Sequence, residues 1–283
     1  MVEVSFAGEH IIKGKSEPQK IYRLDGIRLG ATRFEAALGR GLSAFVGRER
    51  ELEVLERGLD EARTQLCVID IAAEPGIGKS RLLHEFRQRI SKERAFVISG
   101  SCSPDGQQTS LLPFIEVVRG SFRLRPGEAE GDVAQKLETG LTALSMHSAR
   151  NLGLLLHLLG LKVPNDALAG LDGVLIGLRT RELLVQLLKA RCRLSPVVME
   201  IEDLHWIDRV SEEILSTIVD SESKLRLFLL STRRPEYTPT WLDRPVVTEL
   251  NLEPLPRRRH SARGLETARG QESARGTSAA GHG

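Results

Sequence analysis

Short apolar runs alternate with longer polar segments over most of the chain. The runs lie at 67–72, 95–100, 196–201, 225–232 and 246–252, and turn residues bound most of them. A strand that is buried on both faces reads as such a continuous run. Since helix-forming segments separate the runs, the pattern predicts an α/β fold with a mostly parallel sheet of about five strands and helices on both faces.

Leucine recurs at helical spacing between the second and third of these strands. The segment 128–194 is therefore predicted to be a mainly helical insertion, with a long helix that starts at Asp172 or Gly173. Further helices are expected to follow Gly47 and the loop at 73–78. Asp208 is predicted to cap a helix at 211–219, because a side-chain oxygen at this position can accept hydrogen bonds from first-turn amides.

Both ends of the chain differ from this pattern. Residues 1–41 contain strand-like runs at 10–13 and 19–24, and two strands alone do not make a stable domain. Residues 261–278 repeat a six-residue unit without an apolar face, which is typical of a disordered tail. We therefore expect three parts, namely an end piece at 1–41, the main domain at 42–256 and a low-complexity tail at 257–283.

Composition limits the location of the protein and its partners. The hydrophobic fraction of 41% and the charged fraction of 28% are ordinary for a soluble globular protein, and no apolar run is long enough to cross a bilayer. No secretory signal is visible, and three widely spaced cysteines favour a reducing cytoplasm. The net charge of +2 comes from the arginine-rich tail, so a near-neutral body argues against nucleic acid as a partner.

The most specific chemistry follows the first strand of the main domain, where the sequence reads AAEPGIGKSR. Glycines let backbone amides turn around a phosphate chain, and the start of a helix adds partial positive charge. The match to the P-loop pattern G-x-x-x-x-G-K-[ST] has Ala73 at the first glycine, and the alternative is an ordinary turn before a helix. The pattern predicts binding of ATP and Mg²⁺ through Glu74, Pro75, Gly76, Ile77, Gly78, Lys79, Ser80 and Arg81.

A second candidate group lies where the third strand ends. Glu202 and Asp203 follow PVVMEI, and the carboxyl ends of parallel strands meet at one edge of a sheet. One carboxylate there can join a Mg²⁺ shell and the other can orient water, whereas the alternative is a solvated acidic turn. Glu200 falls inside the same strand. Because an unpaired buried carboxylate is costly, we expect it to have a partner or to lie at a sheet edge.

Three motifs in this order resemble the AAA-type ATPases of the signal-transduction (STAND) class. They are FVGRERELEVL before the loop, EDLHWID after the third strand and STRRPE after the fourth. The resemblance implies that Lys79 contacts the β- and γ-phosphates, that Ser80 and Glu202 hold Mg²⁺ and that Asp203 positions water. It also implies roles near the adenine for Val46, Gly47 and Arg48, and reading of the γ-phosphate by Thr232 and Arg233. A structural ion pair is the alternative for Arg233.

The end piece carries a separate resemblance. IKGKSEPQKIYRLDG resembles the last strands of class III adenylate/guanylate cyclase domains, with an unrelated hairpin as the alternative. The cyclase metal-binding aspartates would lie upstream and nothing here matches them, so cyclase activity is not expected. The STAND resemblance implies a helical lid and further helical domains after the last strand. Relative to that class, the chain looks truncated at both ends or frame-disrupted.

These observations leave three functional hypotheses. The first is an ATP-binding, ATP-hydrolysing regulatory switch in a cyclase-linked signalling protein, with ATP/ADP and the C-terminal helical domains or other proteins as partners. The second is a nucleotide-gated DNA-binding or transcriptional regulator, although no DNA-binding motif is visible. The third is a degenerate fragment that binds nucleotide without turnover.

Overall fold

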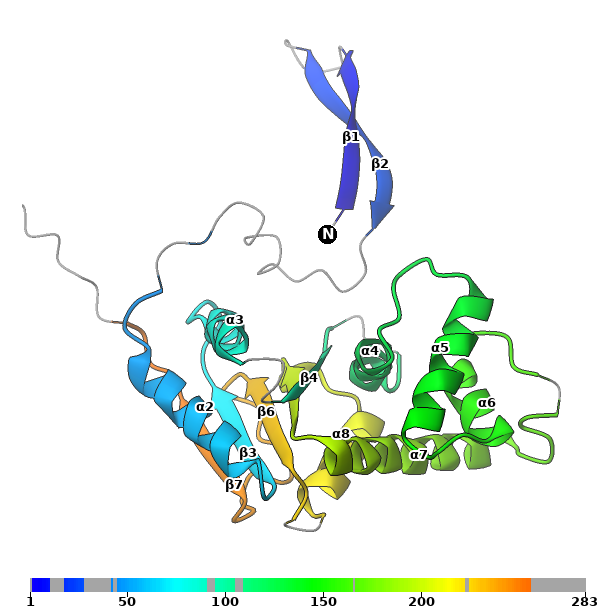
Figure 1. Cartoon of the computed structure of the whole chain (residues 1–283). Helices are drawn as coiled ribbons and strands as arrows, with labels where there is room; N and C mark the ends of the chain where they lie inside the picture. The colour runs from blue at the N-terminus through cyan, green and yellow to red at the C-terminus, as the bar shows by residue number, and fades with distance from the viewer. Residues whose placement is uncertain are drawn as a thin grey trace, which may run out of the picture. The chain divides into compact units, whose positions relative to one another are not determined.

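The computed structural model describes residues 2–10, 18–27, 42, 45–90, 95–104, 109–164, 166–221 and 224–255. Within these residues, five strands of the main domain form one sheet in the order β4-β5-β6-β3-β7, and every neighbouring pair is parallel (Figure 1). The bounds are β3 Cys67–Ala72, β4 Phe96–Ser101, β5 Val197–Glu202, β6 Leu227–Arg233 and β7 Val247–Asn251. The sheet confirms the predicted α/β fold, and each strand lies within two residues of its predicted range.

Helices cover both faces of the sheet because alternate strand residues point to opposite sides. Ile69 and Phe228 pack with the helices α2 and α3, whereas Val68 and Leu229 pack with the helices of the other face. The helices are α2 Glu49–Glu61, α3 Lys79–Arg89, α4 Leu112–Ser121, α5 Glu130–Ala143, α6 Ala149–Leu158, α7 Gly173–Leu194 and α8 Arg209–Val219. Helices α5, α6 and α7 form the predicted insertion between β4 and β5, and α6 packs against both of the others.

Side-chain caps start two of these helices where the sequence predicts them. Asp172 accepts a hydrogen bond from the amide of Leu175 at 2.8 Å, and α7 begins at Gly173. Asp208 accepts from the amides of Val210 and Ser211, both at 3.1 Å, at the start of α8. A 3₁₀ turn at Leu204–Trp206 is the element between β5 and α8, so this cap fixes the chain shortly beyond the paired carboxylates.

The N-terminal residues form a separate antiparallel hairpin of β1 Val2–His10 and β2 Gln19–Ile27. The second strand agrees with its prediction, but the first lies before the predicted run at 10–13. Its sequence VEVSF alternates apolar and polar residues, as a half-buried strand does, whereas the run at 10–13 alternates less regularly. The exposed rings of Phe6 and Tyr22 meet edge to face at 5.6 Å.

Several sequence predictions fall outside the described residues. They concern positions 11–13, the rest of the end piece at 28–41 and the tail at 257–283. In the part of the chain that the structure describes, no helix combines the length and apolarity that a bilayer crossing requires.

Gly100 in β4 allows α4 to approach the sheet closely. A Cβ atom at this position would lie 2.3 Å from the carbonyl oxygen of Pro113, which is backbone and cannot rotate away. Gly100→Ala is therefore expected to lower the free energy of unfolding by about 1–3 kcal/mol. Urea denaturation measures this change. Gly177→Ala in α7 is the matched control, because a Cβ there meets nothing within 4 Å and alanine should leave stability equal or higher.

Candidate functional site

The loop between β3 and α3 has the geometry that anion binding needs. Gly76 and Gly78 adopt left-handed backbone conformations with φ of +83° and +106°, and a Cβ on either would meet no atom within 4 Å. Helix α3 begins at Lys79 without a side-chain cap, so the first-turn amides are available to an anion. Ala73 is only 2% exposed and packs in the core beside α2 and α3, so its methyl group is accommodated there.

Lys79 lies across this loop. Its Nζ donates to the carbonyl oxygens of Ala73 at 2.6 Å and of Glu74 at 3.3 Å. Burial lowers the pKa of Lys79, while the carboxylate of Asp203 acts in the opposite direction. The ammonium group and the Asp203 carboxylate therefore face the same region, as the sequence predicts from the parallel sheet.

The end of β5 meets the start of α3. Ser80 Oγ donates to Glu202 Oε2 at 3.0 Å, although the two residues are 122 positions apart. The other oxygen of this carboxylate, Oε1, accepts from an Arg87 guanidinium nitrogen at 2.7 Å. The structure thus brings together the hydroxyl and the carboxylate expected to hold Mg²⁺, and it adds an arginine that our sequence analysis does not include.

Arg87 is also the partner that Glu200 requires. Its Nε lies 2.5 Å from Glu200 Oε2, as an ion pair rather than an aligned hydrogen bond. Glu200 is 0% exposed and sits on a strand between β4 and β6, so the alternative of a sheet-edge position is excluded. Burial raises the pKa of Glu200 to about 7, with Arg87 lowering it and Glu202 raising it.

Asp203 leaves β5 in a left-handed conformation with φ of 60°, and its amide donates to Thr232 Oγ1 at 3.0 Å. This bond joins the carboxyl ends of β5 and β6. Burial raises the pKa of Asp203, and the charges of Lys79 and Arg234 lower it. Nearby, burial together with Arg234 and Lys79 lowers the pKa of His205 to about 4, so its imidazole is neutral at pH 7.

Arg233 does not point toward the loop. It is 2% exposed, its Nε lies 2.5 Å from Asp70 Oδ2, and it also bonds the side chain of Glu249 and the carbonyl oxygen of Tyr237. The reason is strand alternation, since Arg233 shares a face of β6 with Leu229 and not with Thr232. The structure therefore favours the alternative of a structural ion pair, with partners on β3 and β7.

The next residue, Arg234, is the arginine on the loop side. Its charge acts on Lys79, Asp203 and His205, lowering the pKa of each. Its guanidinium carbon lies 5.7 Å from the centre of the Trp206 ring, and its side chain is 35% exposed. Neighbouring residues of a strand point to opposite faces, so only one of two adjacent arginines at a strand end can lie on the loop side. This rule could have identified Arg234 as a candidate from the sequence.

The three residues predicted near the adenine take different positions. Val46 is 46% exposed, and the amide of Gly47 donates to Glu49 at 3.2 Å. Arg48 is buried and donates to Glu51 and to the carbonyl oxygen of Glu253, both at 2.6 Å, and more weakly to that of Ile77 at 3.5 Å. Arg48 thus links the phosphate loop, through Ile77, to the segment that follows β7, through Glu253.

Arg81, in the first turn of α3, pairs with Glu85 at 2.6 Å and lies 5.7 Å from the centre of the Phe45 ring. Its side chain links the helix to the segment that precedes α2. The contact with nucleotide expected for Arg81 stays a prediction, as do those of Val46 and Gly47.

The groups at this site fit a nucleotide with Mg²⁺. The ion binds proteins through one or two carboxylates and completes its shell with phosphate oxygens and water. Ser80 and Glu202 supply that donor set, next to open glycine amides. Among the residues with described positions, no cluster of three His, Cys, Asp or Glu side chains could hold a metal ion unaided.

Comparisons with known proteins were made over the whole chain. An uncharacterized protein of Rhizobium meliloti (strain 1021) is 32% identical over 255 residues, which is 88% of this chain but 24% of that protein. The chain therefore spans about a quarter of the length of this curated relative.

Two solved structures show weaker likeness over 75% of this chain. Cdc6p from Pyrobaculum aerophilum has 14% identity and a TM-score of 0.40, with 46% of its chain covered. A STAND protein with a tetratricopeptide repeat sensor from Pyrococcus horikoshii has 17% identity and a TM-score of 0.34, with 23% covered.

A family model described as AAA ATPase domain matches residues 44–230, which hold the phosphate loop, the paired carboxylates, three whole strands of the sheet and the first part of β6. The chain therefore belongs to the AAA ATPase domain family.

Proposed function

We propose that the chain is an ATP-binding and ATP-hydrolysing regulatory module of a cyclase-linked signalling protein. The observation that carries the ATPase part is the contact of Ser80 with Glu202 at 3.0 Å beside an open glycine loop. A hydroxyl and a carboxylate that meet at the start of such a helix are suited to a Mg²⁺ ion on a bound triphosphate. The cyclase link and the C-terminal helical partners are supported by the sequence resemblances alone.

In this proposal each residue acts on a defined part of ATP. The amides from Gly76 to Ser80 bind phosphate oxygens, and Lys79 leaves its loop carbonyls to contact the β- and γ-phosphates. Mg²⁺, when bound, neutralises charge that develops on those phosphates. Asp203 orients the attacking water and accepts its proton. Since Arg233 is occupied by Asp70, we assign the γ-phosphate contact to Arg234 instead.

The experiment compares two variants in binding and in turnover. Lys79→Met is expected to weaken ATP affinity at least about tenfold, because a charge-assisted contact to phosphate is lost. Asp203→Asn should keep ATP affinity within about twofold but slow phosphate release about a hundredfold, because it removes the base and not the cradle. Calorimetry measures binding and a phosphate assay measures turnover.

Two outcomes would change the proposal. Unaltered ATP affinity in Lys79→Met would contradict binding at this loop. Tight ATP binding by the unmodified protein without any phosphate release would favour the hypothesis of a nucleotide-binding fragment without turnover.

A further inference from the structure

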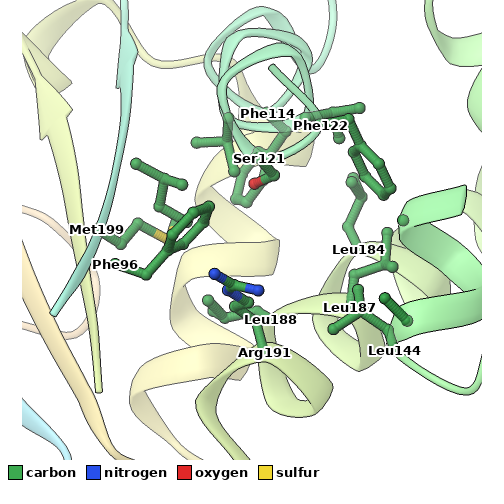
Figure 2. A pocket seen from close by; sticks show the side chains of 15 residues that line it. Phe96, Phe114, Ser121, Phe122, Leu144, Leu184, Leu187, Leu188, Arg191 and Met199 are labelled. Atoms are coloured by element: carbon green, nitrogen blue, oxygen red, sulfur yellow. The ribbon is translucent and has the colours of Figure 1, made fainter. Parts of the chain in front are cut away.

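A mainly apolar pocket lies on the face of the sheet opposite to α3. It is formed by α4, α5 and α7 against β4 and β5, and its cavity volume is about 110 Å³ (Figure 2). Phe96, Phe114, Leu187 and Met199 are among the side chains that line it. An apolar protein cavity of about 150 Å³ is large enough to bind benzene. This pocket is smaller than that cavity but partly open, so it suits one small ring or a short branched chain whose polar end stays at the open edge.

Two polar side chains, Arg191 and Ser121, also line the pocket. Figure 2 shows the guanidinium nitrogens of Arg191 and the hydroxyl of Ser121 directed into the same space. The guanidinium carbon of Arg191 lies 3.7 Å from the centre of the Phe96 ring, so the cation packs against an aromatic side chain of the pocket wall.

Arg191 lacks a compensating group. Its Nε is buried without a hydrogen-bond partner, and no carboxylate among the described residues forms an ion pair with it. Burial lowers the pKa of Arg191, and the positive charge of Arg123 lowers it further. Arg191 and Arg123 thus give one edge of an apolar pocket a positive charge, with which an anionic group of a ligand can pair.

We propose that this pocket binds a small apolar carboxylate, with the ring or alkyl group among the leucines and phenylalanines. The carboxylate accepts hydrogen bonds from the edge of Arg191 and from the hydroxyl of Ser121. Met199 points to this side of β5, whereas Glu200 points to the side of Arg87 and α3. The pocket is thus distinct from the phosphate loop, and the proposal does not depend on ATP binding.

Met199 offers a local reporter for the test. The chain has three methionines, so the methyl signals of ¹³C-methionine-labelled protein can be assigned with a Met199→Leu variant. Benzoate is expected to shift the Met199 signal to saturation. Benzamide, a neutral compound of the same shape, should bind at least about tenfold more weakly, since it lacks the charge-assisted hydrogen bonds.

Three variants separate the carboxylate contact from the apolar space. Arg191→Met should reduce the affinity for benzoate to that for benzamide, and Arg191→Lys should keep part of the preference. Ala143→Phe should weaken binding of both compounds, because Ala143 is exposed at the edge of the pocket and a ring there covers its opening. The absence of a saturable Met199 shift with benzoate in the unmodified protein, or an undiminished benzoate preference in Arg191→Met, would overturn the proposal.

Discussion

Replacement of Arg233 by methionine is expected to lower the free energy of unfolding by about 3–5 kcal/mol. The substitution leaves the Asp70 carboxylate, which is 0% exposed, without its charged partner in the middle of the sheet. Among the side chains with described positions, the hydroxyl of Ser231 is the hydrogen-bond donor that remains. Burial already raises the pKa of Asp70, and loss of Arg233 removes a group that lowers it. Urea denaturation followed by circular dichroism measures the loss.

Arg234→Met is the matched comparison, since it removes the same charge from the next residue. Arg234 keeps a third of its exposure, so its stability should change by less than about 0.5 kcal/mol. Its phosphate release should instead fall about a hundredfold, because a cation that faces the γ-phosphate stabilises charge in the transition state. If Arg233→Met stayed fully stable and lost only turnover, the assignment of the two arginines would have to be exchanged.

The second large effect is a pH dependence of stability that arises at Glu200. Its pKa is about 7 in the folded protein and 4.5 is its ordinary value, so the folded state keeps a proton that the unfolded state releases. Stability from this group is complete below about pH 4.5 and is lost as pH rises through 7. The loss is about 3 kcal/mol in total, since one pKa unit corresponds to about 1.4 kcal/mol.

Glu200→Gln isolates this contribution, because glutamine has the same shape and does not titrate. The difference in unfolding free energy between Glu200→Gln and the unmodified protein should grow by about 2–3 kcal/mol from pH 5 to pH 8, in favour of the variant. A difference that stays constant over this range would show that Arg87 keeps Glu200 ionised throughout. Denaturation curves at four pH values decide between these results.

Local signals in the sequence were sufficient for the individual strands of the sheet and for half of the site. The strand, glycine loop and helix around Lys79 are consecutive, so their arrangement follows from short-range rules. Ser80 lies just after β3 and Glu202 ends β5, so their contact required only that these two strands be parallel. The helix expected after Gly47 and the cap expected at Asp208 rested on equally local signals.

The rest depends on partners that are distant in the chain. Asp70 lies inside an apolar run and gives no sign of its pairing, yet it decides which arginine is buried. Arg87 could have been found, because it lies seven residues after Ser80 and thus on the same face of α3, while Glu200 needed a cation. The strand order that brings β3 between β6 and β7 follows from no local pattern.

That order has a consequence for synthesis on the ribosome. Strand β3 is made early, but its neighbours β6 and β7 come about 160 and about 180 residues later, with Ile69 beside Leu230 and Thr248. The nascent chain therefore exposes its phosphate-loop strand on two open edges until β6 and β7 have left the exit tunnel. During that interval the strand is a target for chaperones and for mispairing, and nucleotide cannot assist folding because its cradle is not yet anchored.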